Sequence, residues 1–154
     1  MDRHLRIARA RSAQPASGVR ILMADHNRRN IELALDAQAR SGVGYDLRVV
    51  QDGEAVLEML FPSCAAPAFL PDVIVMAIDL PPGNAMEIYR GIRASVRTSG
   101  IPVTLVMPSG CQDDLGMHHR VGDNTSVCSP AGLGETIEAL GGLWGIFASL
   151  PPVA

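Results

Sequence analysis

Residues 71–81 read Pro-Asp-Val-Ile-Val-Met-Ala-Ile-Asp-Leu-Pro, and this stretch decides the fold. Its six consecutive apolar residues, Val73 to Ile78, are too few to cross a membrane. A short apolar run of this kind, bounded by turn-forming residues, is typical of a β-strand that is covered on both faces. Strands covered in that way belong to parallel sheets, so the stretch predicts an α/β protein.

The same kind of unit recurs on both sides of this strand. Four more short strands are expected at 19–24, 47–50, 101–107 and 125–128. Apolar residues at helical spacing predict helices at about 27–41, 53–61, 85–96 and 131–150. The segment 110–122 has few apolar positions and predicts only a weak helix. Five strands alternating with five helices predict a parallel sheet with helices on both faces.

The composition fits one domain inside a reducing compartment. At 154 residues the chain is long enough for one compact core. Its three cysteines have no metal-like spacing, and no secretory type of apolar segment stands near the N-terminus. We therefore expect a cytoplasmic protein with an Arg-rich tail at 1–18, one domain at 19–150 and a short tail at 151–154.

All thirteen basic residues are arginine, so the chain contains no lysine. The net charge of −3 gives no general attraction to nucleic acid, and we do not expect such a partner for the domain. Five arginines nevertheless stand in the first twenty residues, against the single acid Asp2. Binding of nucleic acid by this tail stays open as an alternative to a solvated tail.

Several short motifs, in this order and spacing, carry a resemblance to a known family. They are Ile21-Leu22-Met23, Val49-Val50-Gln51-Asp52-Gly53-Glu54-Ala55, Leu60-Phe61, Pro71-Asp72, Leu80-Pro81, Ile101-Pro102-Val103, and Leu143-Trp144-Gly145-Ile146-Phe147 before Pro151-Pro152. From about Val19 to Leu150 the chain resembles the receiver domains of two-component response regulators, and most closely the single-domain receivers that pair with phytochrome-type histidine kinases. The resemblance implies a flavodoxin-like, doubly wound sheet of five parallel strands, in the order 2-1-3-4-5, with five helices.

In that family two acids after the first strand hold Mg²⁺ together with an aspartate that accepts phosphate at the end of the third strand. The acid pair corresponds here to Asp25 and His26, and an imidazole is a poor ligand for Mg²⁺. The acceptor position is Ala77, which has no oxygen to form an acyl phosphate. The resemblance therefore implies a site that has lost its central chemistry.

Three further positions of the family's site are also replaced. The hydroxyl residue at the end of the fourth strand corresponds to Met107, and the phosphate-binding lysine before a proline corresponds to Ser129. The aromatic switch residue of the fifth strand corresponds to Ser126. Because the chain has no lysine at all, a lysine displaced by a residue or two is excluded. We interpret the chain as a pseudo-receiver that is not an enzyme, with no catalytic residue, metal or cofactor.

Two alternatives would keep some chemistry at this site. Asp79 stands two residues after Ala77, on the same side of a continuing strand, and could act as a substitute phosphoacceptor. Asp25, His26 and Asp79 could instead bind a transition metal, and these ligand types suit Zn²⁺ better than Mg²⁺.

If the chemistry is lost, a surface has to carry the function. The expected last helix has two apolar stripes, and only one of them can cover the sheet. The resemblance implies a dimer formed through this segment, either a homodimer or a heterodimer with another receiver. A histidine kinase or a downstream signalling protein is the expected further partner, and a membrane is not. The expected partner-binding residues are Leu143, Trp144, Ile146, Phe147 and Leu150.

Overall fold

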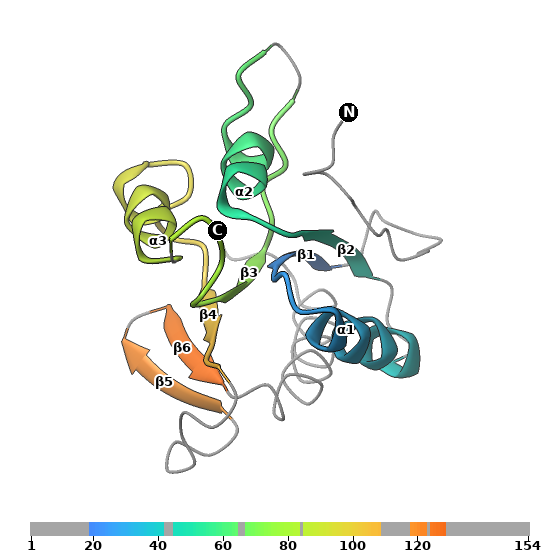
Figure 1. Ribbon diagram of the computed structural model, residues 1–154. Helices are drawn as coiled ribbons and strands as arrows, with labels where there is room; N and C mark the ends of the chain where they lie inside the picture. Colours follow the sequence, from blue (N-terminus) through green and yellow to red (C-terminus); the bar gives the residue numbers. More distant parts are fainter. Residues whose placement is uncertain are drawn as a thin grey trace, which may run out of the picture.

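The computed structural model describes residues 19–41, 45–64, 67–83, 85–108, 118–122 and 124–128. Six strands form one sheet in the order β2-β1-β3-β4-β6-β5 (Figure 1). The strands are β1 (Val19–Ala24), β2 (Tyr45–Val50), β3 (Val73–Ala77), β4 (Val103–Val106), β5 (His118–Gly122) and β6 (Thr125–Cys128). The described helices are α1 (Arg28–Ser41), α2 (Gly53–Leu60) and α3 (Ala85–Ala94).

Five of the strands are parallel, and β3 lies at their centre. All five residues of β3 are buried, as expected of a strand that is covered on both faces. Ile74 and Met76 pack into the core beneath α2 and α3, whereas Val73 and Val75 pack into the core beneath α1. Figure 1 shows α1 on the opposite side of the sheet from α2 and α3. The predicted parallel order 2-1-3-4-5 is confirmed as β2-β1-β3-β4-β6.

Both helices that follow the first two strands begin at a side-chain cap. Asn27 Oδ1 accepts hydrogen bonds from the backbone N–H groups of Arg29 and Asn30, at 2.9 and 3.2 Å. Asp52 Oδ1 accepts one from the backbone N–H of Ala55 at 2.8 Å. These bonds satisfy amide groups that a helix leaves unpaired in its first turn. The predicted start of a helix at Asp52-Gly53 is confirmed.

The prediction of a weak helix over 110–122 is wrong for its last five residues. Strand β5 runs antiparallel to β6 there, at the outer edge of the sheet. Asn124 closes the turn between them with a φ of 58°, a left-handed conformation that asparagine tolerates better than most residues. Backbone pairing with β6 outweighs the weak helical preference of these residues. Three of the five predicted helices lie among the described residues, and the one at 131–150 falls outside them.

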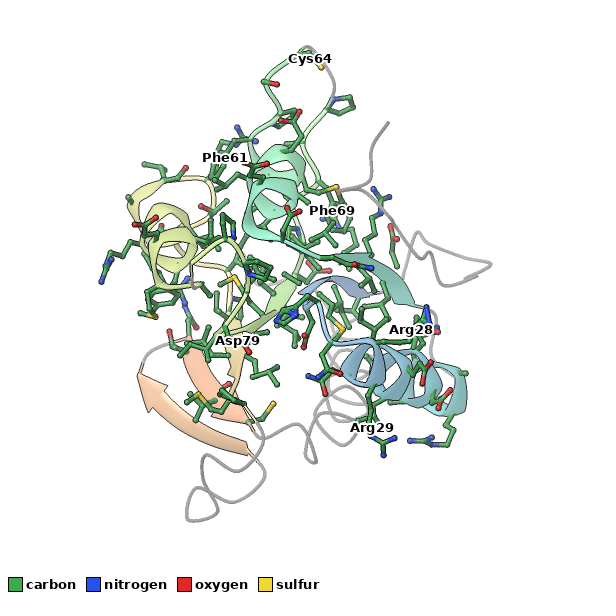
Figure 2. All side chains as sticks on the ribbon, in the orientation of Figure 1. Arg28, Arg29, Phe61, Cys64, Phe69 and Asp79 are labelled. Atoms are coloured by element: carbon green, nitrogen blue, oxygen red, sulfur yellow. The ribbon has the colours of Figure 1, made fainter. Side chains whose placement is uncertain are left out.

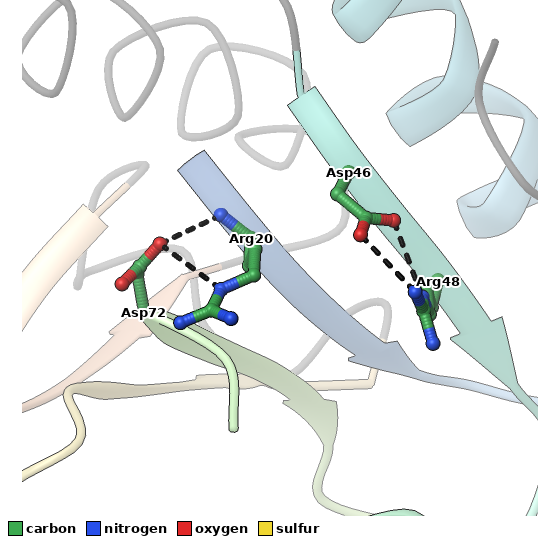
Figure 3. A network of polar contacts seen from close by, with 4 residues as sticks. All are labelled: Arg20, Asp46, Arg48 and Asp72. Atoms are coloured by element: carbon green, nitrogen blue, oxygen red, sulfur yellow. Dashed lines mark hydrogen bonds and ion pairs between the residues drawn. The ribbon is translucent and has the colours of Figure 1, made fainter. Parts of the chain in front are cut away.

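Two arginine–aspartate contacts lie near the β2 edge of the sheet (Figure 3). Asp72 Oδ2 accepts the backbone N–H of Arg20 at 2.8 Å and lies 3.9 Å from Arg20 Nε. The backbone N–H of Asp72 donates to Arg20 O, also at 2.8 Å, so the entry to β3 is fixed against β1. Arg48 contacts both carboxylate oxygens of Asp46 at 3.2 Å, and its guanidinium lies 4.3 Å from the ring centre of Phe69.

Among the described helices, none combines the length and the apolar character that crossing a membrane requires.

Candidate functional site

The ends of β1, β3 and β4 bring three of the predicted site positions to one edge of the sheet. Asp25 follows β1 and donates its backbone N–H to Val50 O at 3.0 Å. Ala77 is the last residue of β3 and is paired with Val106. Met107 follows β4 and donates its backbone N–H to Cys128 O at 2.9 Å. The carboxyl ends of parallel strands are where ligands bind in open α/β sheets, so this edge is the candidate site.

Asp25 is a buried carboxylate whose two oxygens both accept hydrogen bonds from within the chain. The exposed fraction of Asp25 is 1%. Oδ1 accepts the backbone N–H of Asn27 at 2.9 Å, and Oδ2 accepts the side-chain amide of Asn30 at 2.9 Å. Burial raises the pKa of Asp25, the hydrogen bonds and the nearby His26 act to lower it, and Asp79 acts to raise it. The carboxylate therefore anchors the start of α1.

Asn30 was not predicted as a site residue, although the sequence carried a signal for it. Asn30, Ala34 and Ala37 are spaced at helical intervals on the buried side of α1. A polar residue on such a face needs a partner inside the protein. The sequence does not show that this partner is Asp25, because that contact depends on how the β1–α1 turn folds.

His26 and Asp79 face each other across the candidate site. His26 Nε2 lies 3.6 Å from Asp79 Oδ1, and the side chains are 42% and 57% exposed. Asp79 lies in the turn that follows β3, because the strand ends at Ala77 and does not continue to it as predicted (Figure 2). Within the part of the chain that the structure describes, no three His, Cys, Asp or Glu side chains are grouped so that they could hold a metal ion. The alternative of a metal site at Asp25, His26 and Asp79 thus gains no support.

The structure places three of the remaining predicted positions, Ala77, Met107 and Ser126. Ala77 is buried, with a residue exposure of 2%. Met107 is partly buried and packs against the core beneath α2 and α3. Ser126 Oγ lies 3.0 Å from Thr104 Oγ1 on the adjacent strand β4, so a hydroxyl pair stands at the predicted switch position. Ser129 and the five predicted partner-binding residues of 143–150 lie outside the described residues.

Comparisons with known proteins agree with this architecture. No family model matches the chain. A probable methanogenesis regulatory protein, FilR2 of Methanothrix harundinacea (strain 6Ac), is 26% identical over 127 residues, which cover 80% of this chain and 82% of that protein.

Two solved structures show the fold directly. The bacteriophytochrome response regulator RtBRR is 30% identical with a TM-score of 0.53, over 58% of this chain and 55% of that one, so this chain spans about half of its length. The Mn²⁺-bound form of response regulator Rcp1 is 19% identical with a TM-score of 0.65, over 87% of this chain and 99% of that one. The chain thus has the fold of the response-regulator receiver domains, with bacteriophytochrome response regulators among its structural matches.

Proposed function

We propose that this chain is a receiver domain that acts without phosphorylation, as a protein-interaction module in two-component signalling. The observation that carries the proposal is Ala77. Its methyl group is buried at the end of β3, where the resemblance places the phosphoacceptor. An acyl phosphate needs a carboxylate oxygen as the nucleophile, and alanine has none.

The neighbours of Ala77 do not restore the chemistry. Phosphoryl transfer depends on cations and hydrogen-bond donors that stabilise the charge on the transferred group. The chain has no lysine, and the thioether side chain of Met107 cannot donate a hydrogen bond. Asp25 is held by Asn27 and Asn30. The other carboxylate of the candidate site, that of Asp79, lies in an exposed turn beside His26.

Intact mass spectrometry after incubation with acetyl phosphate and Mg²⁺ tests this proposal. A phosphorylatable receiver treated in parallel is the positive control. We expect no added phosphoryl group on this chain, in wild type or in the variant Asp79→Asn. A phosphoryl adduct on the wild type that is lost in Asp79→Asn would overturn the proposal and establish the substitute acceptor.

The proposed partners follow from similarity and from sequence. The 30% identity to a bacteriophytochrome response regulator, over 58% of the chain, supports a place in a phytochrome-linked pathway. The apolar stripes of residues 131–150 support a dimer, with itself or with a competent receiver. Light scattering of the full chain and of Trp144→Ser tests the homodimer. We expect a dimeric wild type and a weakened dimer in the variant, and a monomeric wild type would leave the heterodimer as the proposal.

A further inference from the structure

All five N–H groups of one guanidinium are engaged at the β6 side of the sheet. Arg93, in the last turn of α3, has five donor contacts between 2.7 and 3.4 Å. Three acceptors are backbone carbonyls and two are hydroxyls: Ser99 O, Ile101 O, Asn124 O, Thr125 Oγ1 and Tyr89 OH. None of the five acceptors is a carboxylate. The contacts therefore depend on the planar arrangement of the five guanidinium donors as well as on the positive charge.

The acceptors belong to three separate segments of the chain. Tyr89 lies on α3, one turn before Arg93. Ser99 and Ile101 lie in the connection between α3 and β4. Asn124 and Thr125 lie 31 and 32 residues after Arg93, in the β5–β6 turn and at the start of β6. One side chain therefore connects α3 to the edge hairpin and to the connection that leads into β4.

Further contacts surround this connection. Tyr89 OH lies 2.8 Å from Thr125 Oγ1, and the Arg93 guanidinium lies 5.1 Å from the centre of the Tyr89 ring. The carbonyl of Asn124 also accepts the backbone N–H of Val103 at 2.9 Å. In the α3–β4 connection, the fully buried Thr98 donates its hydroxyl to Ile92 O at 2.6 Å.

We propose that Arg93 is a conformational lock that ties the β5–β6 hairpin to α3, so that this edge of the sheet moves as one body. Loss of the guanidinium would take these donors from three backbone carbonyls, of which Asn124 O would keep the N–H of Val103. Lysine would keep the charge but could not supply five donors in a planar fork.

The lock has a consequence for signalling. Strand β6 carries Ser126 at the predicted switch position, so the lock would hold that strand in one state without phosphate. This consequence rests on the proposed function. The lock itself is tested without any phosphodonor, so its failure and the failure of the proposed function are distinguishable.

Hydrogen–deuterium exchange of the full chain tests the lock. We compare the wild type with Arg93→Gln and Arg93→Lys, and use Arg90→Gln, at an exposed position of the same helix, as the matched control. In both Arg93 variants we expect exchange at least about tenfold faster over 98–108 and 118–128, and unchanged over β1. Arg90→Gln should exchange like the wild type.

Three results would overturn the lock. They are unchanged exchange over 98–108 and 118–128 in Arg93→Gln, exchange that rises equally across the whole domain, or full restoration by lysine. Should Arg93→Gln fail to fold, Tyr89→Phe replaces it, since that variant removes only one hydroxyl. We then expect faster exchange over 118–128, and exchange like that of the wild type would equally overturn the lock.

Discussion

The side-chain amide of Asn30 donates a hydrogen bond to Asp25 Oδ2 at 2.9 Å, between two residues that are both buried. Both carboxylate oxygens of Asp25 therefore have donors from within the fold, since Oδ1 accepts the backbone N–H of Asn27. A bond to a charged acceptor is stronger than one between neutral groups, and its loss leaves a buried carboxylate oxygen with one donor fewer.

We expect Asn30→Ala to lower the free energy of unfolding by about 1–3 kcal/mol, because a buried charged acceptor loses its partner. Urea unfolding at neutral pH measures the change. Arg29→Gln, at the neighbouring exposed position, is the control and should stay within about 0.5 kcal/mol of the wild type. Equal stability of Asn30→Ala and the wild type would show that Asp25 does not depend on this amide.

Asp25 should make the stability depend on pH in the direction opposite to most carboxylates. Burial raises its pKa above the ordinary value of 3.8, so the folded state binds the proton more tightly than the unfolded state. The contribution of this group to stability is therefore largest below pH 3.8 and is lost as the pH rises through the folded-state pKa.

The variant Asp25→Asn removes that titration. When the side-chain amide of Asn30 flips by about 180°, its oxygen can accept a hydrogen bond from the amide introduced at position 25. We expect the stability of Asp25→Asn relative to the wild type to increase as the pH rises from 3.8 toward neutral, in urea unfolding at a series of pH values. A relative stability that falls over the same range would contradict the raised pKa.

The wild type should show no Mg²⁺-dependent stabilisation. The side chain of Ala77 offers no oxygen, and the imidazole of His26 is a poor ligand for this hard cation. In the double variant His26→Asp, Ala77→Asp two carboxylates join Asp25, and we expect a melting temperature that rises with Mg²⁺, by an amount equivalent to about 2.7 kcal/mol at a hundred times the dissociation constant. A melting temperature of the wild type that rises with Mg²⁺ and saturates would contradict the loss of the ion site.

Two helical glycines should respond differently to alanine. A Cβ on Gly91, in the interior of α3, would meet no atom within 4 Å. We expect Gly91→Ala to stabilise the chain by about 0.5–1 kcal/mol, because alanine restricts the unfolded chain more. A Cβ on Gly53 would lie 3.0 Å from Ile88 Cδ1 and 3.1 Å from its Cγ1.

For Gly53→Ala we therefore expect a loss of roughly 1 kcal/mol, since Ile88 packs against the core and has to shift. Thermal unfolding of the two variants beside the wild type measures both changes. Equal gains at the two positions would show that α2 and α3 adjust freely around Gly53.

The amino-acid sequence alone determined the parallel sheet and the absence of a carboxylate at position 77. A strand as apolar as 73–77 has to be covered on both faces. This requirement indicates the α/β class, and it does not depend on the exact residues at which the neighbouring helices and strands begin or end. The absence of a carboxylate at position 77 does not depend on the fold, because no packing arrangement gives alanine one. The sequence did not show that β3 ends at Ala77, because the apolar run continues to Ile78. As a result Asp79 lies in a turn and not on the strand.

Only the tertiary structure decided how the polar groups are paired and which form the segment before β6 takes. Asn30 meets Asp25 because the β1–α1 turn folds back, and Arg93 meets Asn124 across 31 residues because α3 packs beside the edge hairpin. The weak helical pattern of 110–122 gave way to β5 in its last five residues, since backbone pairing with β6 outweighs a small local preference. Partners far apart in sequence depend on which elements lie side by side, and that arrangement is set by the packing of the whole domain.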